Sequence, residues 1–393
     1  MSKLEERFVE FLKKHYVVIF VIAITLVGAM MRYSGRNFKS ADWHVFFSVW
    51  YDSILKNGQM ASMQYPIGDY NVFFQFLVAI FTYIPKDPLY LFKVLAICFD
   101  FSLAVACGAC VYEFTKKDKR LSVLAYSLVW VSPFVVFNST YWVQTDSIYT
   151  SFIMWALFFL LKKKNVPAFV MLGCALAFKV QVLFVLPFLV FVYVLNKSFS
   201  ALHLLITVFV GWLSSIPAIL HGRGLFVFFE VYGGQQAELH DMTVHYPNLW
   251  MILRGSYEHT EGFAIFLTTA VLGIGMYLLL SKGVRLDTGE KMLNTLIWTV
   301  WTVVMIMPGM HDRYGYLLET ILLVASVYNI KKYGLYLLGA YLPTMMAYTR
   351  YLFEVDHNLA FWSVLSLVTY VAFTYRIFVK VIWSQNEECV AVR

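Results

Sequence analysis

The sequence predicts an all-α fold: a polytopic membrane helical bundle of about 12 transmembrane helices, with amphipathic surface helices in the first outer loop. Two observations lead to this class. Hydrophobic residues make up 60% of the 393-residue chain and charged residues only 14%, whereas soluble domains carry about 25% charged residues. Apolar segments also recur from one end of the chain to the other. The formal charge of +7 is then explained by Lys and Arg gathered on one membrane face, and no nucleic-acid partner is expected.

Three regions are expected in order along the chain. Residues 1–15 are predicted to form a cytoplasmic amphipathic helix on the membrane surface. Residues 16–381 should form a single transmembrane domain with long outer loops at 32–87 and 221–261, and residues 382–393 a cytoplasmic tail. The predicted spans are 16–31, 88–113, 121–138, 147–161, 166–178, 181–195, 200–220, 263–281, 292–308, 315–330, 333–350 and 358–378.

The first outer loop contains two predicted helices, 43–55 and 71–84. The second has about 14 residues, which is short for a bilayer crossing of about 20, so both are placed along the outer surface. The positive-inside rule supports this choice. With twelve spans and a cytoplasmic N-terminus, the dense basic clusters, such as 116–120 and 162–164, all lie in the cytoplasm. The outer face then receives the long polar loops, and we expect the function to lie there.

Asp42, just beyond the first span, is the candidate catalytic base. Three basic residues lie close to it in the sequence: Arg36, Lys39 and His44. Neighbouring cations favour the ionised form of a carboxylate, which suits a group that accepts a proton. A solvated loop acid, or an N-cap for the helix at 43–55, would explain the same residue. Asp52 and Asp69 are rival acids in the same loop.

The segment 142–146 joins two apolar spans and is a candidate sugar site. Trp142 offers an apolar face for a sugar ring, while Gln144 and Asp146 offer hydrogen bonds to sugar hydroxyls. Asp69 is assigned to the same substrate site. The alternative for Asp146 is a cap for the helix that follows.

Basic side chains at the outer ends of other spans are candidates for holding a phosphate group. They are Lys179, Arg223, His311 and Arg313. Arg binds phosphate oxygens through its planar fork, and a Lys at the membrane is a functional candidate by default. The alternatives are interfacial anchoring, snorkelling of the Lys to the surface, or a structural ion pair.

Other polar residues on the outer side are candidate substrate contacts. They are Gln181, beside Lys179, and Tyr232, Gln235 and Asn248 in the second outer loop. That loop is too long and too polar to serve only as a connector. The nine His residues show no HExxH-type spacing, so neither a metal centre nor another cofactor is predicted, although acids could hold a single divalent cation.

Four short motifs carry a family resemblance. They are Gly68-Asp69-Tyr70-Asn71, 141–149, Ala177-Phe178-Lys179-Val180-Gln181 and 307–314. Together they resemble polytopic glycosyltransferases of the GT-C type, most of all bacterial relatives of the eukaryotic GPI mannosyltransferases. Those relatives typically read W-G-Q-x-D and M-H-E-R-Y. Here the segments read Trp142-Val143-Gln144-Thr145-Asp146 and Met310-His311-Asp312-Arg313-Tyr314, with Val for Gly and Asp for Glu.

The resemblance covers nearly the whole chain and implies an inverting hexosyltransferase that needs no metal. Such an enzyme passes a sugar, for example mannose, from a polyprenyl-phosphate donor to an acceptor hydroxyl of a glycan or glycolipid. The resemblance places this reaction on the outer face of a bacterial plasma membrane, with Asp42 as general base and His311 and Arg313 as phosphate contacts. The rival function is a transporter or flippase for a lipid-linked saccharide, which would more often show inverted repeats and broken helices near mid-membrane.

Overall fold

The protein is all-α, as predicted, in a computed structural model that describes residues 2–237 and 240–381. Within these residues the only strands are β1 (Thr243–Val244) and β2 (Met310–His311), which pair in parallel. The predicted cytoplasmic tail, 382–393, lies outside the described residues.

The first half of the chain contains long helices and several short helical segments. They are α1 (Lys3–Ser34), the π-helical turn η1 (Trp43–Phe47), α2 (Ser48–Lys56), the 3-10 helix η2 (Gln59–Gln64), α3 (Val72–Phe81), α4 (Pro88–Phe114), α5 (Lys119–Trp130), α6 (Pro133–Val136), the π-helical turn η3 (Phe137–Tyr141), α7 (Asp146–Leu161), α8 (Asn165–Phe178), the 3-10 helix η4 (Val180–Val185) and α9 (Leu186–Asn196). Helix α1 contains both the predicted surface helix and the first predicted span. The two helices expected in the first outer loop are present as η1 with α2, and as α3.

The second half of the chain contains the two short strands and further helices of varied length. Its helices are α10 (His203–Leu213), α11 (Ile216–Leu220), α12 (Val227–Ala237), α13 (Leu249–Leu253), α14 (Tyr257–Ser281), α15 (Gly289–Ile306), α16 (Tyr316–Tyr328), α17 (Ile330–Phe353), α18 (Leu359–Tyr375) and the π-helical turn η5 (Arg376–Val381).

Several helix starts follow local sequence signals. The side chain of Asp87 accepts a hydrogen bond from the Leu89 amide, and Pro88 occupies the first position of α4, where a missing N–H has no cost. Asn71 and Asp118 cap α3 and α5 in a similar way. These caps satisfy amide groups that have no partner inside a helix.

Four helical segments are long and apolar enough to cross a membrane: α1, α4, α14 and 359–379. A fifth is added if 119–130 and 133–141, which meet at a 44° bend, count as one span. Other predicted spans coincide with shorter apolar helices, such as α7 and α8. The structure is therefore that of a helical membrane protein with at least four candidate spans among the residues it describes.

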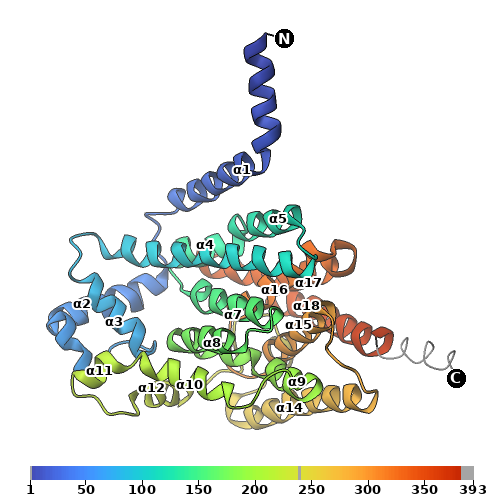
Figure 1. Ribbon diagram of the computed structural model, residues 1–393. Helices are drawn as coiled ribbons and strands as arrows, with labels where there is room; N and C mark the ends of the chain where they lie inside the picture. Colours follow the sequence, from blue (N-terminus) through green and yellow to red (C-terminus); the bar gives the residue numbers. More distant parts are fainter. Residues whose placement is uncertain (1, 238–239, 382–393) are drawn as a thin grey trace.

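The helices pack in two neighbouring groups around one large apolar core (Figure 1). In the first group α4 packs on α5 and α7, α7 on α8, and α8 on α10. In the second, α16 packs on α17 and α17 on α18. Large aromatic side chains belong to this core, including Trp142, Tyr149, Trp301 and Tyr316. The N-terminal part of α1 projects away from both groups (Figure 1), whereas its C-terminal part packs near α5.

A buried ion pair ties the end of α1 to α4. The Arg32 guanidinium lies 2.8 Å from the Asp100 carboxylate, and both side chains are almost fully buried. Arg32 also donates a hydrogen bond to the Trp130 carbonyl oxygen at 2.9 Å, and the Ser139 hydroxyl donates one to Asp100 at 2.6 Å. Because charged groups in a membrane need partners, this pair fixes where α1 ends and where the chain toward Asp42 begins.

Candidate functional site

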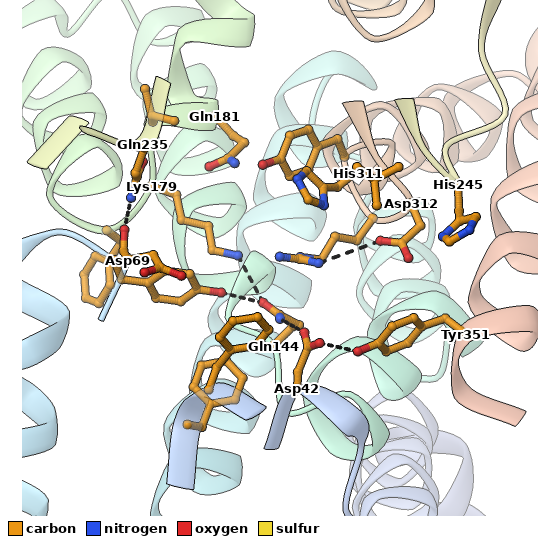
Figure 2. A pocket seen from close by; sticks show the side chains of 18 of the residues that line it. Asp42, Asp69, Gln144, Lys179, Gln181, Gln235, His245, His311, Asp312 and Tyr351 are labelled. Atoms are coloured by element: carbon orange, nitrogen blue, oxygen red, sulfur yellow. Dashed lines mark hydrogen bonds and ion pairs between the residues drawn. The ribbon is translucent and has the colours of Figure 1, made fainter. Parts of the chain in front are cut away.

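A cavity of about 510 Å³ brings most of the predicted site residues together (Figure 2). Its lining comes from segments far apart in the sequence, which include η1, the turn before α3, the break between α8 and η4, and the β1–β2 region. The predicted residues that line it are Asp42, Asp69, Gln144, Lys179, Gln181, Tyr232, Gln235, His311 and Arg313. Aromatic side chains line it as well: Phe46, Phe47, Trp50, Tyr70, Phe178, Tyr314 and Tyr351.

Side chains from other helices fix the backbone that carries Asp42. The ammonium group of Lys93, in α4, donates to three carbonyl oxygens beyond the end of α1, at 2.8, 3.0 and 2.7 Å: those of Gly35, Arg36 and Phe38. The Ser40 hydroxyl donates to the carbonyl oxygen of Trp142 at 2.7 Å. The turn is therefore joined both to α4 and to the segment that contacts Asp42 directly.

The carboxylate of Asp42 accepts three hydrogen bonds. Its Oδ2 accepts from the Trp142 indole Nε1 at 2.9 Å and from Gln144 Nε2 at 2.5 Å. Its Oδ1 accepts from the Tyr351 hydroxyl in α17. Asp42 is only 7% exposed and makes no capping hydrogen bond to η1, so neither a solvated acid nor an N-cap describes it. A carboxylate has about four lone-pair sites, so Oδ1 keeps one that can accept a proton.

A strained residue sets the direction of two of these donors. Val143 lies between Trp142 and Gln144, and its φ is 67°. A β-branched residue rarely adopts this left-handed conformation, which costs about 1–3 kcal/mol. Val143 is fully buried in an apolar cluster with Trp43 and Phe47, so packing holds it there. The position would suit glycine, because glycine adopts positive φ without strain.

Gln144 connects the Asp42 carboxylate to a group of charged side chains. Its Oε1 accepts a hydrogen bond from the Tyr70 hydroxyl at 2.6 Å and a longer one from Lys179 Nζ at 3.4 Å. Lys179 Nζ also donates to Asp146 at 2.6 Å. Figure 2 shows Gln144 between Asp42 and Lys179. The Asp42 carboxylate and the Lys179 ammonium group are therefore joined through one amide side chain.

Asp146 is the buried counter-charge of both cations at the site. Besides Lys179, it faces Arg313 Nε at 3.7 Å and accepts a hydrogen bond from Asn138 Nδ2 at 2.7 Å. Burial by itself would lower the pKa of Lys179, but the charge of Asp146 raises it above its usual value, so Lys179 is a cation. Lys179 is 5% exposed and does not snorkel. Nε of Arg313 makes no hydrogen bond in the described structure, and the side chain lines the cavity.

The segment between α15 and α16 supplies a second group of titratable residues. Strand β2 aligns His311 with Val244 of β1. Burial, reinforced by the Arg313 charge, lowers the pKa of His311 to about 3, so its imidazole is neutral. Burial raises the pKa of Asp312 to about 7, although Arg313 acts in the opposite direction. Arg313, and not His311, is then the positive group in this segment.

Asp312 should make stability depend on pH near neutrality. Its pKa is about 7 in the folded protein against an ordinary 3.8, so between these values the folded state binds more protons and its stability falls as pH rises. His311 acts oppositely between about 3 and 6.5. We therefore expect the melting temperature of Asp312→Asn, relative to the unchanged protein, to rise between about pH 5 and about pH 8.

The measurement is a series of thermal melts in detergent at stepped pH. Asp52→Asn, which removes an exposed carboxylate, is the matched control and should give a constant offset across the series. A constant offset for Asp312→Asn as well would show that Asp312 does not titrate in this range.

Four of the predicted residues do not line the cavity. The Trp142 ring is fully buried, stacked on Tyr351 at 4.4 Å, so it orients Asp42 and presents no face to a sugar. Asp146 contacts the cavity only indirectly, through its ion pairs with Lys179 and Arg313. Asn248 caps α13 by accepting from the Trp250 and Met251 amides. Arg223 lies after α11 and is not among the lining residues.

Three features of the site differ from the sequence-based expectation. The basic neighbours expected to act on Asp42 do not contact it: Lys39 and His44 are exposed, and Arg36 bonds to the Tyr33 carbonyl. Tyr351 was not a candidate, because nothing near it in the sequence marks it. The Arg32–Asp100 pair was also missed. An acid inside the long apolar run of α4 is the signal that could have found it.

The arrangement combines a carboxylate that has a vacant lone-pair site with two cations at the same cavity. That combination can take a proton from a hydroxyl and stabilise an anionic leaving group. Among the described residues no group of three or more His, Cys, Asp or Glu side chains could hold a metal ion. No protein-family model matches the chain, and no curated protein matches it significantly. The function is therefore inferred from the site itself.

Proposed function

We propose that the protein is an inverting glycosyltransferase of the GT-C type. It moves a hexose such as mannose from a polyprenyl-phosphate donor to an acceptor hydroxyl, in the assembly of a cell-surface glycan or glycolipid. The observation that carries this proposal is the cavity that Asp42 shares with Arg313 and Lys179. The short motifs that resemble GT-C enzymes supply most of these residues.

The proposed reaction assigns a role to each charged group. Oδ1 of Asp42 accepts the proton of the acceptor hydroxyl as the hydroxyl oxygen attacks the anomeric carbon. The bond from that carbon to the phosphate oxygen breaks, and the lipid phosphate leaves with the electron pair. Arg313 and Lys179 stabilise this anion. Attack from the side opposite the phosphate inverts the configuration.

Neutral polar side chains complete the proposed substrate site. Gln181 and Gln235 line the cavity and can bond sugar hydroxyls, and neutral His311 is available as a hydrogen-bonding group. The Tyr232 hydroxyl already donates to the Leu176 carbonyl, so Tyr232 contributes its ring. Asp69 is an exposed lining residue. Trp142 and Asp146 do not line the cavity; Trp142 holds Asp42 by a hydrogen bond, and Asp146 pairs with Lys179 and Arg313.

The proposal includes a membrane orientation. Twelve spans place both termini in the cytoplasm and the cavity on the outer face of a bacterial plasma membrane. Shorter helices such as α7 and α8 would then cross as protein-surrounded segments, because their faces are covered by neighbouring helices. The breaks next to them, at 142–146 and at Lys179, lie at the cavity, where irregular backbone is tolerated in a membrane protein.

The direct test is transfer of labelled sugar from a polyprenyl-phosphate donor by the purified protein. A glycosyltransferase yields labelled acceptor in detergent, where no membrane separates two compartments. A transporter or flippase gives no transfer in detergent but moves a lipid-linked saccharide across reconstituted vesicles. That second result would replace the proposed function by the rival one.

Replacing Arg313 with Ala should weaken use of the donor far more than use of the acceptor. A hydrogen bond to a charged group contributes about 1.5–3 kcal/mol, so we expect the KM for the donor to rise about 10- to 100-fold. Arg313→Lys should recover only part of this, because Lys lacks the planar fork. Arg223→Ala is the matched control, because it removes an arginine that does not line the cavity, and it should change the donor KM little. Equal losses toward donor and acceptor would contradict the phosphate role.

Reporter fusions should identify the sides of the membrane. Fusions after Lys119 and after Lys164 are expected to read cytoplasmic, and a fusion within 225–260 external, because basic loops are retained in the cytoplasm. An external signal after Lys119 would make 71–84 a true span and reverse the orientation of the helices that follow.

A further inference from the structure

A second cavity shares no lining residue with the proposed active site. It is a groove of about 770 Å³ between α1, α4 and α5, within the range of about 300–1,000 Å³ found for ligand pockets. Two of its walls, α1 and α4, are candidate membrane spans, and α5 belongs to the bent pair that could form a third. Exposed apolar side chains such as Ile22, Leu26 and Phe101 border it. The groove is therefore positioned to open toward lipid.

The polar atoms inside the groove are already bonded to one another. The Thr25 hydroxyl donates to the Val21 carbonyl oxygen at 2.6 Å and lies 2.6 Å from the Tyr126 hydroxyl. The Ser122 hydroxyl donates to the Gly108 carbonyl oxygen at 2.9 Å. No polar ligand is required to satisfy these groups, so the interior suits an apolar chain.

One end of the groove carries positive charge. Lys119, the first residue of α5, lines it. Lys116, in the turn between α4 and α5, and Arg120, in the first turn of α5, are exposed nearby. The two acids nearest in the sequence already have partners. Glu113 pairs with Lys117 at 2.6 Å, and Asp118 accepts the Arg120 and Leu121 amides as the cap of α5.

We propose that this groove is a binding site for an anionic membrane phospholipid, with an acyl chain along α1 and α4 and the headgroup phosphate on Lys119 and Arg120. The charge at the groove end selects this occupant. A neutral lipid or a partner transmembrane helix would fill the apolar part but would leave these cations without a counter-charge. The site is separate from the proposed glycosyltransferase cavity and does not depend on that function.

The test is native mass spectrometry of the full-length protein, titrated with dioleoyl phosphatidylglycerol or dioleoyl phosphatidylcholine. The first phosphatidylglycerol should bind several-fold more tightly than phosphatidylcholine. Lys119→Gln should reduce phosphatidylglycerol affinity about fivefold, because one basic residue near a membrane surface contributes about that factor, and leave phosphatidylcholine binding unchanged. Lys163→Gln, in the basic turn after α7, is the matched control and should leave both affinities unchanged.

A second pair of variants tests the apolar part of the groove. Ala109→Phe fills it from α4 and should weaken binding of both lipids. Ile22→Trp, at an exposed position of α1, fills it from the other wall and keeps the test valid if Ala109→Phe fails to fold. Equal affinity for both lipids would overturn the proposal, and so would a loss of phosphatidylglycerol affinity in Lys163→Gln as large as that in Lys119→Gln. A dimer that Ile22→Trp dissociates would also overturn it, because the groove would then hold a second copy of the chain.

Discussion

Asp42→Asn is expected to lower sugar transfer by about 10²–10⁴-fold, because it removes the proposed general base. The substitution keeps the shape of the side chain. The Asn oxygen can accept from Trp142 and Gln144 as Oδ2 of Asp42 does. The Asn amide can donate to the Tyr351 hydroxyl, which is able to reverse its role. Folding and donor binding should therefore survive while proton transfer fails.

The measurement combines transfer rate, donor binding and thermal stability of the purified variant. Asp52→Asn is the matched control, because Asp52 is an acid of the same first loop region but is exposed and outside the cavity lining. It should transfer sugar at a near-normal rate. Near-normal transfer by Asp42→Asn would move the base to another acid, with Asp69 the next candidate at the cavity. Loss of transfer together with loss of folding would make Asp42 a structural residue.

Asp146→Asn is expected to destabilise the protein by roughly 3–5 kcal/mol, the cost of leaving a buried charge without its partner. Lys179 pairs with Asp146 at 2.6 Å, and both side chains are at most 5% exposed. Arg313 also faces this carboxylate. The variant leaves two cations close together with no counter-charge of comparable proximity to Lys179. A large fall in melting temperature should be measurable in detergent.

The double variant Asp146→Asn/Lys179→Met provides the control for this mechanism. It removes both charges of the pair, so it should recover part of the stability lost in Asp146→Asn. Its loss of stability should be smaller than the sum of the losses in the two single variants, and the difference is the coupling energy of the pair. Glu113→Gln breaks the more exposed pair with Lys117 and should cost only about 0.2–1 kcal/mol. If the double variant loses as much stability as the two single variants together, or more, charge pairing is not the source of the effect.

Local patterns in the sequence account for much of the candidate site. The position of Asp42 after an apolar segment, and of Lys179 between two short ones, marked both as candidates, and both line the cavity. Polar residues next to apolar runs are visible in a single sequence, because a membrane segment tolerates few of them. Tyr351 carries no such mark. It contacts Asp42 across 309 residues of sequence, and a tyrosine at the end of a membrane helix is equally typical of an interfacial anchor.

Differences in burial gave different roles to residues for which the sequence predicted the same role. His311 and Arg313 were both expected to hold a phosphate, but burial beside Arg313 makes His311 neutral. Trp142 and Gln144 were both expected to contact sugar, but the Trp142 ring stacks on Tyr351 while Gln144 lines the cavity. Spacing along the chain cannot distinguish these cases, because the surroundings of each side chain depend on helices that are distant in the sequence.

By itself, the sequence determined the class of the protein and the outline of its helices. Composition showed that the chain needs a membrane, and caps such as Asp87 and Asp118 set where α4 and α5 begin. These properties depend on neighbours within a few residues, so they can be read locally. Only the tertiary structure decided that Asp42 is buried beneath three donors and that Asp146 pairs with Lys179. Those contacts require helices distant in sequence to pack together, and hydrogen-bond partners are selected by that packing.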